Sequence, residues 1–347
     1  MRLWSVGSYK CLDEFSLPDR APLVDFDFDE SKVMFSYPMV VTSIYAVYTH
    51  VHLFYCNFFP HLIQQRMDGC KDDQIYAHMN CAEWPNAHIR YLDPNAVVGC
   101  EDGRARVFDM YLKKWSQIIK IHDGPVTCLS LTEDQMIIGG SSVGSITVSC
   151  SSANERVATL RSYGSAGIST LCFNPSSHLL FAGSFAGHAS CWDLRVSSVN
   201  FLTQNKPTPI VPGGIPCPDA LGNSRRTRKP VWETRVSPNV IHSIHHLRND
   251  TRTLVMGGID GVLRVADQQT GEVVSRYIIE GRSSSSSVPG GSRRLVERKK
   301  AERIAEDTRL DLMPRTSRPS INCVAVGMQK VVTTHPDNYV RVWKFDK

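Results

Sequence analysis

Apolar residues recur along the chain at a spacing that predicts β-strands. In most copies, an apolar residue is followed by others at the third and fifth positions after it, but the fifth position is Pro94 in one copy and His246 in another. The copies are led by Leu23, Ile89, Val126, Ile168, Ile241 and Ile321. The last two positions share one face of a strand, whereas the first step of three crosses from one face to the other. We therefore expect a bulge near the start of these strands, or burial on both faces.

Each later copy is followed by a second pattern that predicts a β-hairpin. A strand of small and apolar residues precedes a turn, and the next strand ends in an aromatic residue or in valine. Such segments begin at Val97, Ile137, Leu180, Val255 and Val331. Asp102-Gly103 and Asp260-Gly261 strongly favour hairpin turns, because glycine accepts a positive φ.

The intervals between the copies match a four-stranded repeat. Three successive units end at Phe108, Val148 and Trp192, at intervals of 40 and 44 residues. A propeller blade takes about 40–45 residues. The next two intervals are 73 and 78 residues, and the excess falls in 196–230 and 280–319. These segments are rich in Pro, Gly or Ser, so we expect loop insertions there.

The repeated units resemble those of WD-repeat β-propellers, whose repeats end in Trp-Asp, as Trp192-Asp193 does. More narrowly, segments 13–20, 96–103 and 235–240 are similar to the propeller half of plant F-box/WD-repeat proteins. The resemblance implies an all-β, seven-bladed WD-repeat β-propeller. It also implies a non-catalytic scaffold, the substrate receptor of a Skp–cullin–F-box ubiquitin ligase. The F-box would bind the Skp-type adaptor, and the propeller would bind the protein to be tagged.

The first quarter of the chain departs from this pattern. Arg2-Leu3-Trp4 already has the character of a third strand, so we expect no F-box and an incomplete first blade. Residues 1–32 would hold that partial blade and the first strand of the second. Residues 33–87 would be an atypical apolar and aromatic insertion that disrupts the second blade. Residues 88–347 would form the remaining blades.

The atypical segment allows three interpretations. Residues 34–65 contain no Asp, Glu, Lys or Arg, so a membrane span over 34–63 is one of them. A genuine embellishment and translated non-coding sequence are the others. We favour the last, because both atypical segments begin at a valine, Val33 and Val196. Valine codons begin with the bases GT, which also open introns. Limited proteolysis should cut first within 34–87.

Closure of the predicted propeller needs a further strand. The last blade supplies three strands, around Ile321, Val331 and Val340. Residues 9–15 have the alternation of an outer strand, and could complete either their own blade or the last one.

Composition narrows the classes of function. The net charge of +5 is mild for 347 residues, so we expect no nucleic-acid partner and no membrane partner. The 11 cysteines include no C-x-x-C pair, which favours a reducing compartment and a cytoplasmic or nuclear location. The basic run 293–303 is helix-compatible, and is either a solvated loop helix or a nuclear import signal.

Catalysis is not expected. The sequence has no G-x-S-x-G, no P-loop and no G-x-G-x-x-G opening a helix, so we expect no enzyme and no cofactor. An enzyme assembled from separate blades is the alternative. His242, His245 and His246 lie on one strand, but two of them at most share a face. We therefore expect solvated or hydrogen-bonded histidines rather than a metal site.

Partner binding is expected on the top face of the propeller, where partners of WD-repeat proteins usually dock. The residues that follow the leading apolar positions would point there: Arg90, Thr127, Ser169, His242 and Asn322. For each one, an ordinary solvent-facing position is the plainer interpretation.

A second docking mode is suggested by the tetrapeptide Trp192-Asp193-Leu194-Arg195. It resembles the box by which some WD-repeat receptors bind the DDB-type adaptor of cullin-four ligases, and Arg195 would make the charged contacts there. The acidic residue usual earlier in that box is missing. The structural alternative, which we favour, is that Trp192 packs between blades and Asp193 ends its strand.

Overall fold

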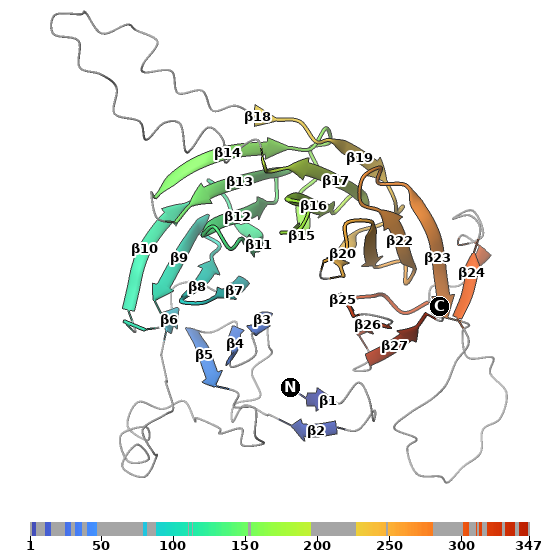
Figure 1. The fold of residues 1–347 in the computed structure, drawn as a ribbon, viewed down its shortest axis with the longest axis horizontal. Helices are drawn as coiled ribbons and strands as arrows, with labels where there is room; N and C mark the ends of the chain where they lie inside the picture. The colour runs from blue at the N-terminus through green and yellow to red at the C-terminus, as the bar shows by residue number, and fades with distance from the viewer. Residues whose placement is uncertain are drawn as a thin grey trace, which may run out of the picture. The chain divides into compact units, whose positions relative to one another are not determined.

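The structure of the chain is a computed structural model, and the elements assigned in its described part are all β-strands (Figure 1). The described residues are 2–4, 11–14, 25–28, 32–36, 40–46, 79–81, 88–109, 111–112, 114–151, 154–195, 227–247, 249–279, 301–304, 310, 312–313, 318–327, 330–336 and 340–345. Within these ranges, no helix is long and apolar enough to cross a membrane. The chain divides into two compact units. Unit 1 is Met1–Val126 with Ser283–Lys299, and unit 2 is Thr127–Arg282 with Lys300–Lys347.

Unit 1 contains three antiparallel sheets. The first pairs β1 (Arg2–Trp4) with β2 (Cys11–Glu14). The second has the order β3 (Asp25–Phe28), β4 (Lys32–Ser36), β5 (Val40–Ala46) and β6 (Met79–Cys81). The third comprises β7 (His88–Leu92), β8 (Asn95–Gly99), β9 (Arg104–Asp109) and β10 (Lys114–Lys120).

Three strands of the second sheet, β4, β5 and β6, fall wholly or mostly in the segment predicted to be an insertion. Strand β4 pairs with β3, with Phe35 opposite Phe26, and β5 pairs with both β4 and β6. Residues 47–78 lie outside the described residues, as do all the side chains before residue 88. The boundaries 1–32 and 33–87 therefore stay a prediction, and so does the origin of the segment.

The described part of unit 2 forms four sheets. The strands of each sheet follow one another along the chain, except that β18 is added to the first sheet and β19 follows β17 in the second. The first is β11 (Val126–Leu131), β12 (Met136–Ser141), β13 (Ser145–Cys150), β14 (Glu155–Arg161) and β18 (Thr227–Arg228). The second is β15 (Ile168–Asn174), β16 (Leu179–Ser184), β17 (His188–Asp193) and β19 (Trp232–Arg235). The third is β20 (Ile241–His246), β21 (Thr253–Gly258), β22 (Leu263–Asp267), β23 (Val273–Ile279) and β24 (Ala301–Ile304). The fourth is β25 (Cys323–Val326), β26 (Lys330–Thr334) and β27 (Val340–Lys344).

The predicted hairpins are confirmed. Four of the turns between a second and a third strand are described in full, and each carries a glycine at positive φ, near +75°: Gly103, Gly144, Gly187 and Gly261. The two Asp-Gly turns singled out in the sequence are the first and the last of these.

The predicted bulge is confirmed in two of the first strands. The pairing register shifts between Ile168 and Thr170 in β15, and between Ile241 and Ser243 in β20. In β7 the pairing with β8 runs without a shift. There the buried residues are Ile89 and Tyr91, two apart, so simple alternation suffices and the bulge expected at this strand is absent.

Strands β15, β20 and β25 pack on one another in turn, and β15 packs on β12 of the first sheet. The first strands lie on the inner side of unit 2 (Figure 1). The leading isoleucine of each sheet sits against a glycine in the second strand of the preceding sheet. A Cβ added at Gly140, Gly183 or Gly257 would lie 3.0, 2.9 or 2.5 Å from the isoleucine Cγ2. The partners are Ile168, Ile241 and Ile321 respectively. The leading apolar residues are therefore the contacts that join one sheet to the next.

Both predicted insertions contribute an outer strand. Strand β18 lies within 196–230 and pairs in parallel with β14, and β24 lies within 280–319 and pairs with β23. Ile304 at the end of β24 is buried beside Val262 and Ile278. The expectation of a helix through 293–303 is wrong for Ala301–Arg303. Their backbone groups pair with the exposed edge of β23 instead.

The last sheet has three strands in the described part of the chain, as predicted. Cys11–Glu14, from the segment expected to be an outer strand, pairs with β1 and so completes its own sheet. Seven sheets in all are formed by the described residues, and the predicted all-β class is confirmed.

Candidate protein-binding face

One edge of the sheets in unit 2 gathers two kinds of connection. Because neighbouring strands are antiparallel, the hairpin from second to third strand lies at the same edge as the loop from fourth strand to the next sheet. The hairpins are 141–144, 184–187 and 258–261, and the loops are 162–167 and 236–240. We call the surface formed by these five segments the top face.

The five segments touch in sequence. Gly144 packs closely on the backbone of Ala166. A Cβ added at Gly144 would lie 2.8 Å from the carbonyl oxygen of Ala166. Backbone hydrogen bonds make the other links: from Phe185 N to Gly167 O at 2.9 Å, from Ser237 N to Gly187 O at 3.1 Å, and from Ile259 N to Val240 O at 3.2 Å. Hairpins and loops thus alternate without a break, and form one continuous surface.

Large apolar side chains stand out from this surface. Val143, Tyr163, Phe185 and Ile259 are 72%, 68%, 48% and 43% exposed. Each hairpin supplies one of them, and the loop before β15 supplies the tyrosine. Contiguous exposed apolar groups mark interaction sites, because covering them removes apolar area from water.

The exposed charges beside these apolar groups are positive. Arg161 ends β14 and Arg235 ends β19. Each directly precedes a loop of the top face, and both are exposed. Neither guanidinium forms an ion pair with a described residue.

The carboxylates of the top face are already engaged within the protein. The two oxygens of Glu233 accept hydrogen bonds from Ser162 Oγ at 2.7 Å and from Tyr163 N at 2.8 Å. Asp260 is buried and pairs with Arg264, at 2.7 Å between Oδ2 and Nη2. Among the described residues, the charge available to a partner on this surface is therefore that of the arginines.

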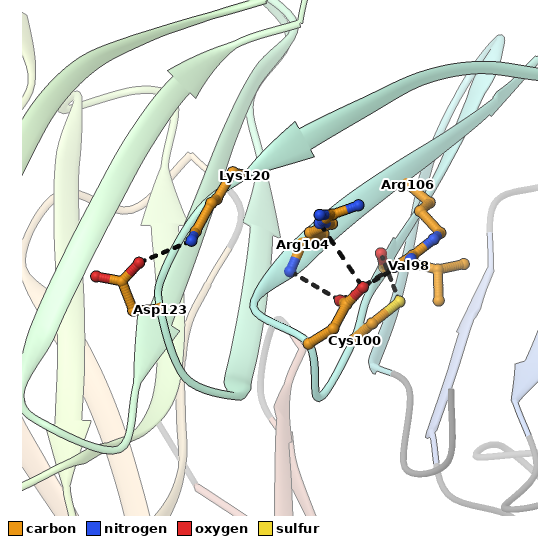
Figure 2. Close-up of polar contacts among 7 residues, drawn as sticks. Val98, Cys100, Arg104, Arg106, Lys120 and Asp123 are labelled. Carbon is orange, nitrogen blue, oxygen red and sulfur yellow. Dashed lines mark hydrogen bonds and ion pairs between the residues drawn. The ribbon is translucent and has the colours of Figure 1, made fainter. Parts of the chain in front are cut away.

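In the third sheet of unit 1, the hairpin is held by an Asp–Arg pair of the same kind as the pair of Asp260 with Arg264 (Figure 2). Asp102 receives two hydrogen bonds from Arg106, at 2.7 and 3.1 Å, and one from Arg104 N at 3.0 Å. The hydrogen bonds of Arg106 hold the pKa of Asp102 below its usual value. Lys120 and Asp123 pair nearby at 2.8 Å, on the exposed turn that follows β10. The repeated Asp-Gly-x-x-Arg motif thus fixes the shape of two hairpins.

Comparison with known proteins identifies the family. A model of the WD domain, G-beta repeat, matches residues 154–193. An F-box/WD-40 repeat-containing protein of Arabidopsis thaliana is 41% identical over 350 residues, which are 100% of this chain and 69% of that protein. The chain belongs to the F-box/WD-40 repeat family. The predicted WD-repeat β-propeller class is thereby confirmed, and such repeats support a protein-interaction scaffold.

A solved structure shares the fold of this chain. The crystal structure of the computationally designed Ika8 protein superposes with a TM-score of 0.55. The match covers 95% of this chain and 73% of that one at 13% identity, so it shows the fold alone.

Two residues predicted to face a partner tie neighbouring sheets of the F-box/WD-40 repeat protein together. Thr127 Oγ1 donates to Ile168 O at 2.7 Å, and Ser169 Oγ donates in the same way to Ile241 O. Both side chains are half-buried, and each carbonyl belongs to the leading isoleucine of the next sheet. These hydroxyls therefore help to hold the inner strands in register.

The other predicted partner-facing residues are placed differently. His242 and Asn322 are exposed at the start of the third and fourth sheets of unit 2, and Arg90 is half-buried in unit 1. Burial on one side lowers the pKa of His242. Contact of any of the five with a partner stays a prediction.

Sequence reasoning missed the residues that dominate the top face. Val143, Phe185 and Ile259 stand one or two places before a hairpin glycine, where turn-forming polar residues are usual. A large apolar residue in such a turn was the feature of the sequence that could have indicated these exposed positions. Tyr163 gave none, because its loop has no counterpart of the same length in the other repeats.

Of the histidines of β20, His246 is held by hydrogen bonds, whereas the buried Nδ1 of His245 has no hydrogen-bond partner in the described part of the chain. The ring nitrogens of His246 lie 2.9 Å from Leu247 O and 3.1 Å from Phe173 O. The His245 ring stacks on it at 5.9 Å between centroids, and burial lowers the pKa of His245. Among the residues described, no group of three His, Cys, Asp or Glu side chains is arranged to hold a metal ion.

The Trp192 tetrapeptide lies at the opposite edge of its sheet. Trp192 is fully buried in the core between the first two sheets of unit 2. Arg195 is exposed, and its guanidinium donates to both oxygens of Asp193, with Nε 3.0 Å from each. These hydrogen bonds hold the pKa of Asp193 below its usual value. The arginine is thus held by its own strand end, and adaptor binding by Trp192, Asp193 and Arg195 stays a prediction.

Proposed function

We propose that this chain is the target-binding propeller of a Skp–cullin–F-box type ubiquitin-ligase receptor. It holds a protein on the top face so that the ligase can tag it. Membership of the F-box/WD-40 repeat family supports the ligase assignment. The single observation that supports the binding role is the continuous surface that bears exposed Val143, Tyr163, Phe185 and Ile259.

The chemistry of this surface suits binding without catalysis. Its prominent side chains are aliphatic or aromatic, and offer burial area rather than a nucleophile or a base. The nearby hydroxyls of Thr127 and Ser169 donate hydrogen bonds to backbone carbonyls. A scaffold that positions a partner needs apolar anchors within a polar rim, and the top face has that composition.

The test is to tag the protein at its own genomic locus and to purify it from cells treated with a proteasome inhibitor. We expect a Skp-type adaptor and a cullin to co-purify, together with a protein whose abundance rises when the receptor gene is deleted. Exchange of both Tyr163 and Phe185 for serine should release that target and keep the adaptor.

The same experiment examines the competing ligase class. If a DDB-type adaptor co-purifies instead, and is lost in the variant Arg195→Ala, the receptor belongs to a cullin-four ligase. If neither adaptor co-purifies, the proposed ligase role is wrong, whatever the top face binds.

A further inference from the structure

We propose that the top face recognises a segment of polypeptide in which a large apolar side chain is flanked by Asp or Glu. The inference rests on the proposed function, and names the chemistry of the partner. It is carried by the juxtaposition of the exposed Tyr163 and Phe185 with the exposed Arg161 and Arg235.

The apolar part of the partner follows from the place of the two aromatic rings. Phe185 is hydrogen-bonded through its N to Gly167 O, in the loop that also bears Tyr163. The ring of Phe185 lies over Gly167, 2.9 Å from where a Cβ would stand. The two aromatic residues therefore belong to adjoining segments of one surface, and both are exposed to an apolar side chain of a partner. Tyrosine and phenylalanine bury large areas at small entropic cost, and serve as interface anchors.

The acidic residues of the partner are inferred from the exposed charges that have no ion-pair partner among the described residues. Glu233 accepts from Ser162 and from Tyr163 N, and Asp260 is paired with Arg264. The exposed charges of the described top face are then the guanidiniums of Arg161 and Arg235. A carboxylate placed beside either one makes charge-assisted hydrogen bonds. A basic partner would meet repulsion there.

The surface is built to keep its shape. Both oxygens of Glu233 hold the loop of Tyr163 to β19, and the adjoining hairpins turn through Gly144 and Gly187 at φ of 77° and 81°. A fixed surface loses little entropy when a partner binds. It is therefore suited to bind a short, flexible segment of polypeptide, which loses conformational entropy when it binds.

A nucleic acid is the macromolecule that the observations favour less. Aromatic rings and arginines also stack on bases, but backbone binding takes a groove that neutralises several phosphates. Two exposed guanidiniums at the ends of separate outer strands do not make such a groove.

The experiment is selection from a random peptide library displayed on phage against the purified full chain. The enriched peptides are then synthesised and measured by fluorescence anisotropy. We expect apolar residues flanked by Asp or Glu. Exchange of those acids for Asn and Gln should weaken binding about tenfold or more. Tyr163→Ser and Phe185→Ser should each weaken binding to a similar extent.

Charge-reversal variants test the role of the two arginines more directly. Arg161→Glu and Arg235→Glu should weaken the acidic peptides, and strengthen versions in which Lys replaces the acids. Val274→Ser and Arg252→Glu are the matched controls, because both residues are exposed and lie away from the top face. They should leave binding unchanged.

Three results would overturn the inference: no peptide is enriched, the enriched peptides keep their affinity without acids, or a single-stranded RNA oligonucleotide displaces them. Enrichment of basic peptides that still need Phe185 would refute the acidic partner and leave the proposed function standing. Conversely, loss of both ligase adaptors from the tagged protein would refute the ligase role and leave the peptide result intact.

Discussion

At the scale of single residues, two tryptophans at equivalent places differ in their partners. Trp343 Nε1 donates to Thr333 Oγ1 at 2.9 Å, and the same hydroxyl lies 2.9 Å from His335 Nε2. The indole nitrogen of Trp192 is buried and has no hydrogen-bond partner. The neighbouring strands explain the difference. Leu180 stands opposite Trp192 and Val331 stands opposite Trp343, and the residue two places further along the partner strand is Ala182 in the sheet of Trp192 and Thr333 in the sheet of Trp343.

Two exchanges test this comparison in opposite directions. Thr333→Val should lower the free energy of unfolding by about 1–3 kcal/mol, because it leaves a buried indole N–H unpaired. Ala182→Ser should raise it by about 1 kcal/mol, because the new hydroxyl can accept from Trp192. Urea unfolding measures both. A destabilised Ala182→Ser variant would mean that the site has no room for the oxygen.

The two Asp–Arg pairs of the hairpins provide a second comparison. The side chains of Asp260 and Arg264 are each 2% exposed, whereas Asp102 is 34% exposed beside its buried Arg106. Asp260→Asn should cost about 3–5 kcal/mol, because it leaves a buried guanidinium without its counter-charge. Asp102→Asn should cost less, since water can reach that site. Equal losses in thermal or urea unfolding would contradict the role of burial.

The histidines of β20 predict a dependence of stability on pH. Burial, and then the charge of His246, hold the pKa of His245 below its ordinary value of 6.5. The unfolded chain therefore binds this proton more readily, and stability falls as pH decreases below that value. We expect a lower free energy of unfolding at about pH 5.5 than at about pH 8. His245→Gln should reduce the difference, and part should remain because the pKa of His242 is lowered too.

At the scale of elements, the contact of an isoleucine with a glycine joins one sheet to the next. An added Cβ at Gly257 would stand 2.5 Å from Ile321 Cγ2 and 2.9 Å from Val324 Cγ2. Gly257→Ala should therefore destabilise by about 1–3 kcal/mol through overpacking. Gly124→Ala is the matched control, because nothing lies within 4 Å of its added Cβ. If both variants unfold alike, the close packing of the sheets is not what limits this position.

Strands that follow the repeat could be predicted from the sequence, and those outside it could not. Hydrophobic spacing located the inner strands and the hairpins, because burial on one face imposes that spacing. Strands β18 and β24 carry no such pattern. They are short, partly charged, and form by adding to an existing edge. Strands β4 and β5 show no repeat pattern either, and only the pairing of β4 with β3 and of β5 with β4 places them.

At the scale of the whole molecule, the binding surface and the stabilising core use different residues. The double exchange of Tyr163 and Phe185 for serine should remove partner binding and change the free energy of unfolding by no more than about 1 kcal/mol, because both side chains project into solvent. Thermal unfolding and peptide binding, measured on the same preparation, check this. Simultaneous loss of fold and binding would show that the rings support the hairpins.

The candidate site was only half visible in the sequence. Equivalent positions in a repeat pointed to the edge of the sheets at which the top face lies, since a repeated topology returns the same loops to that edge. The side chains chosen there, such as Thr127 and Ser169, are spent on bonds between strands. The exposed ones lie in turns, whose side chains face solvent without regard to strand periodicity. Their exposure follows from tertiary placement.

The strands β18 and β24 lie along the outer rims of two sheets. An open rim can recruit another protein through its bare amide and carbonyl groups, whatever the sequence of the newcomer. Because β18 and β24 cover part of these edges, fewer backbone groups are open to non-specific strand pairing. Discrimination among ligands is then left to side chains.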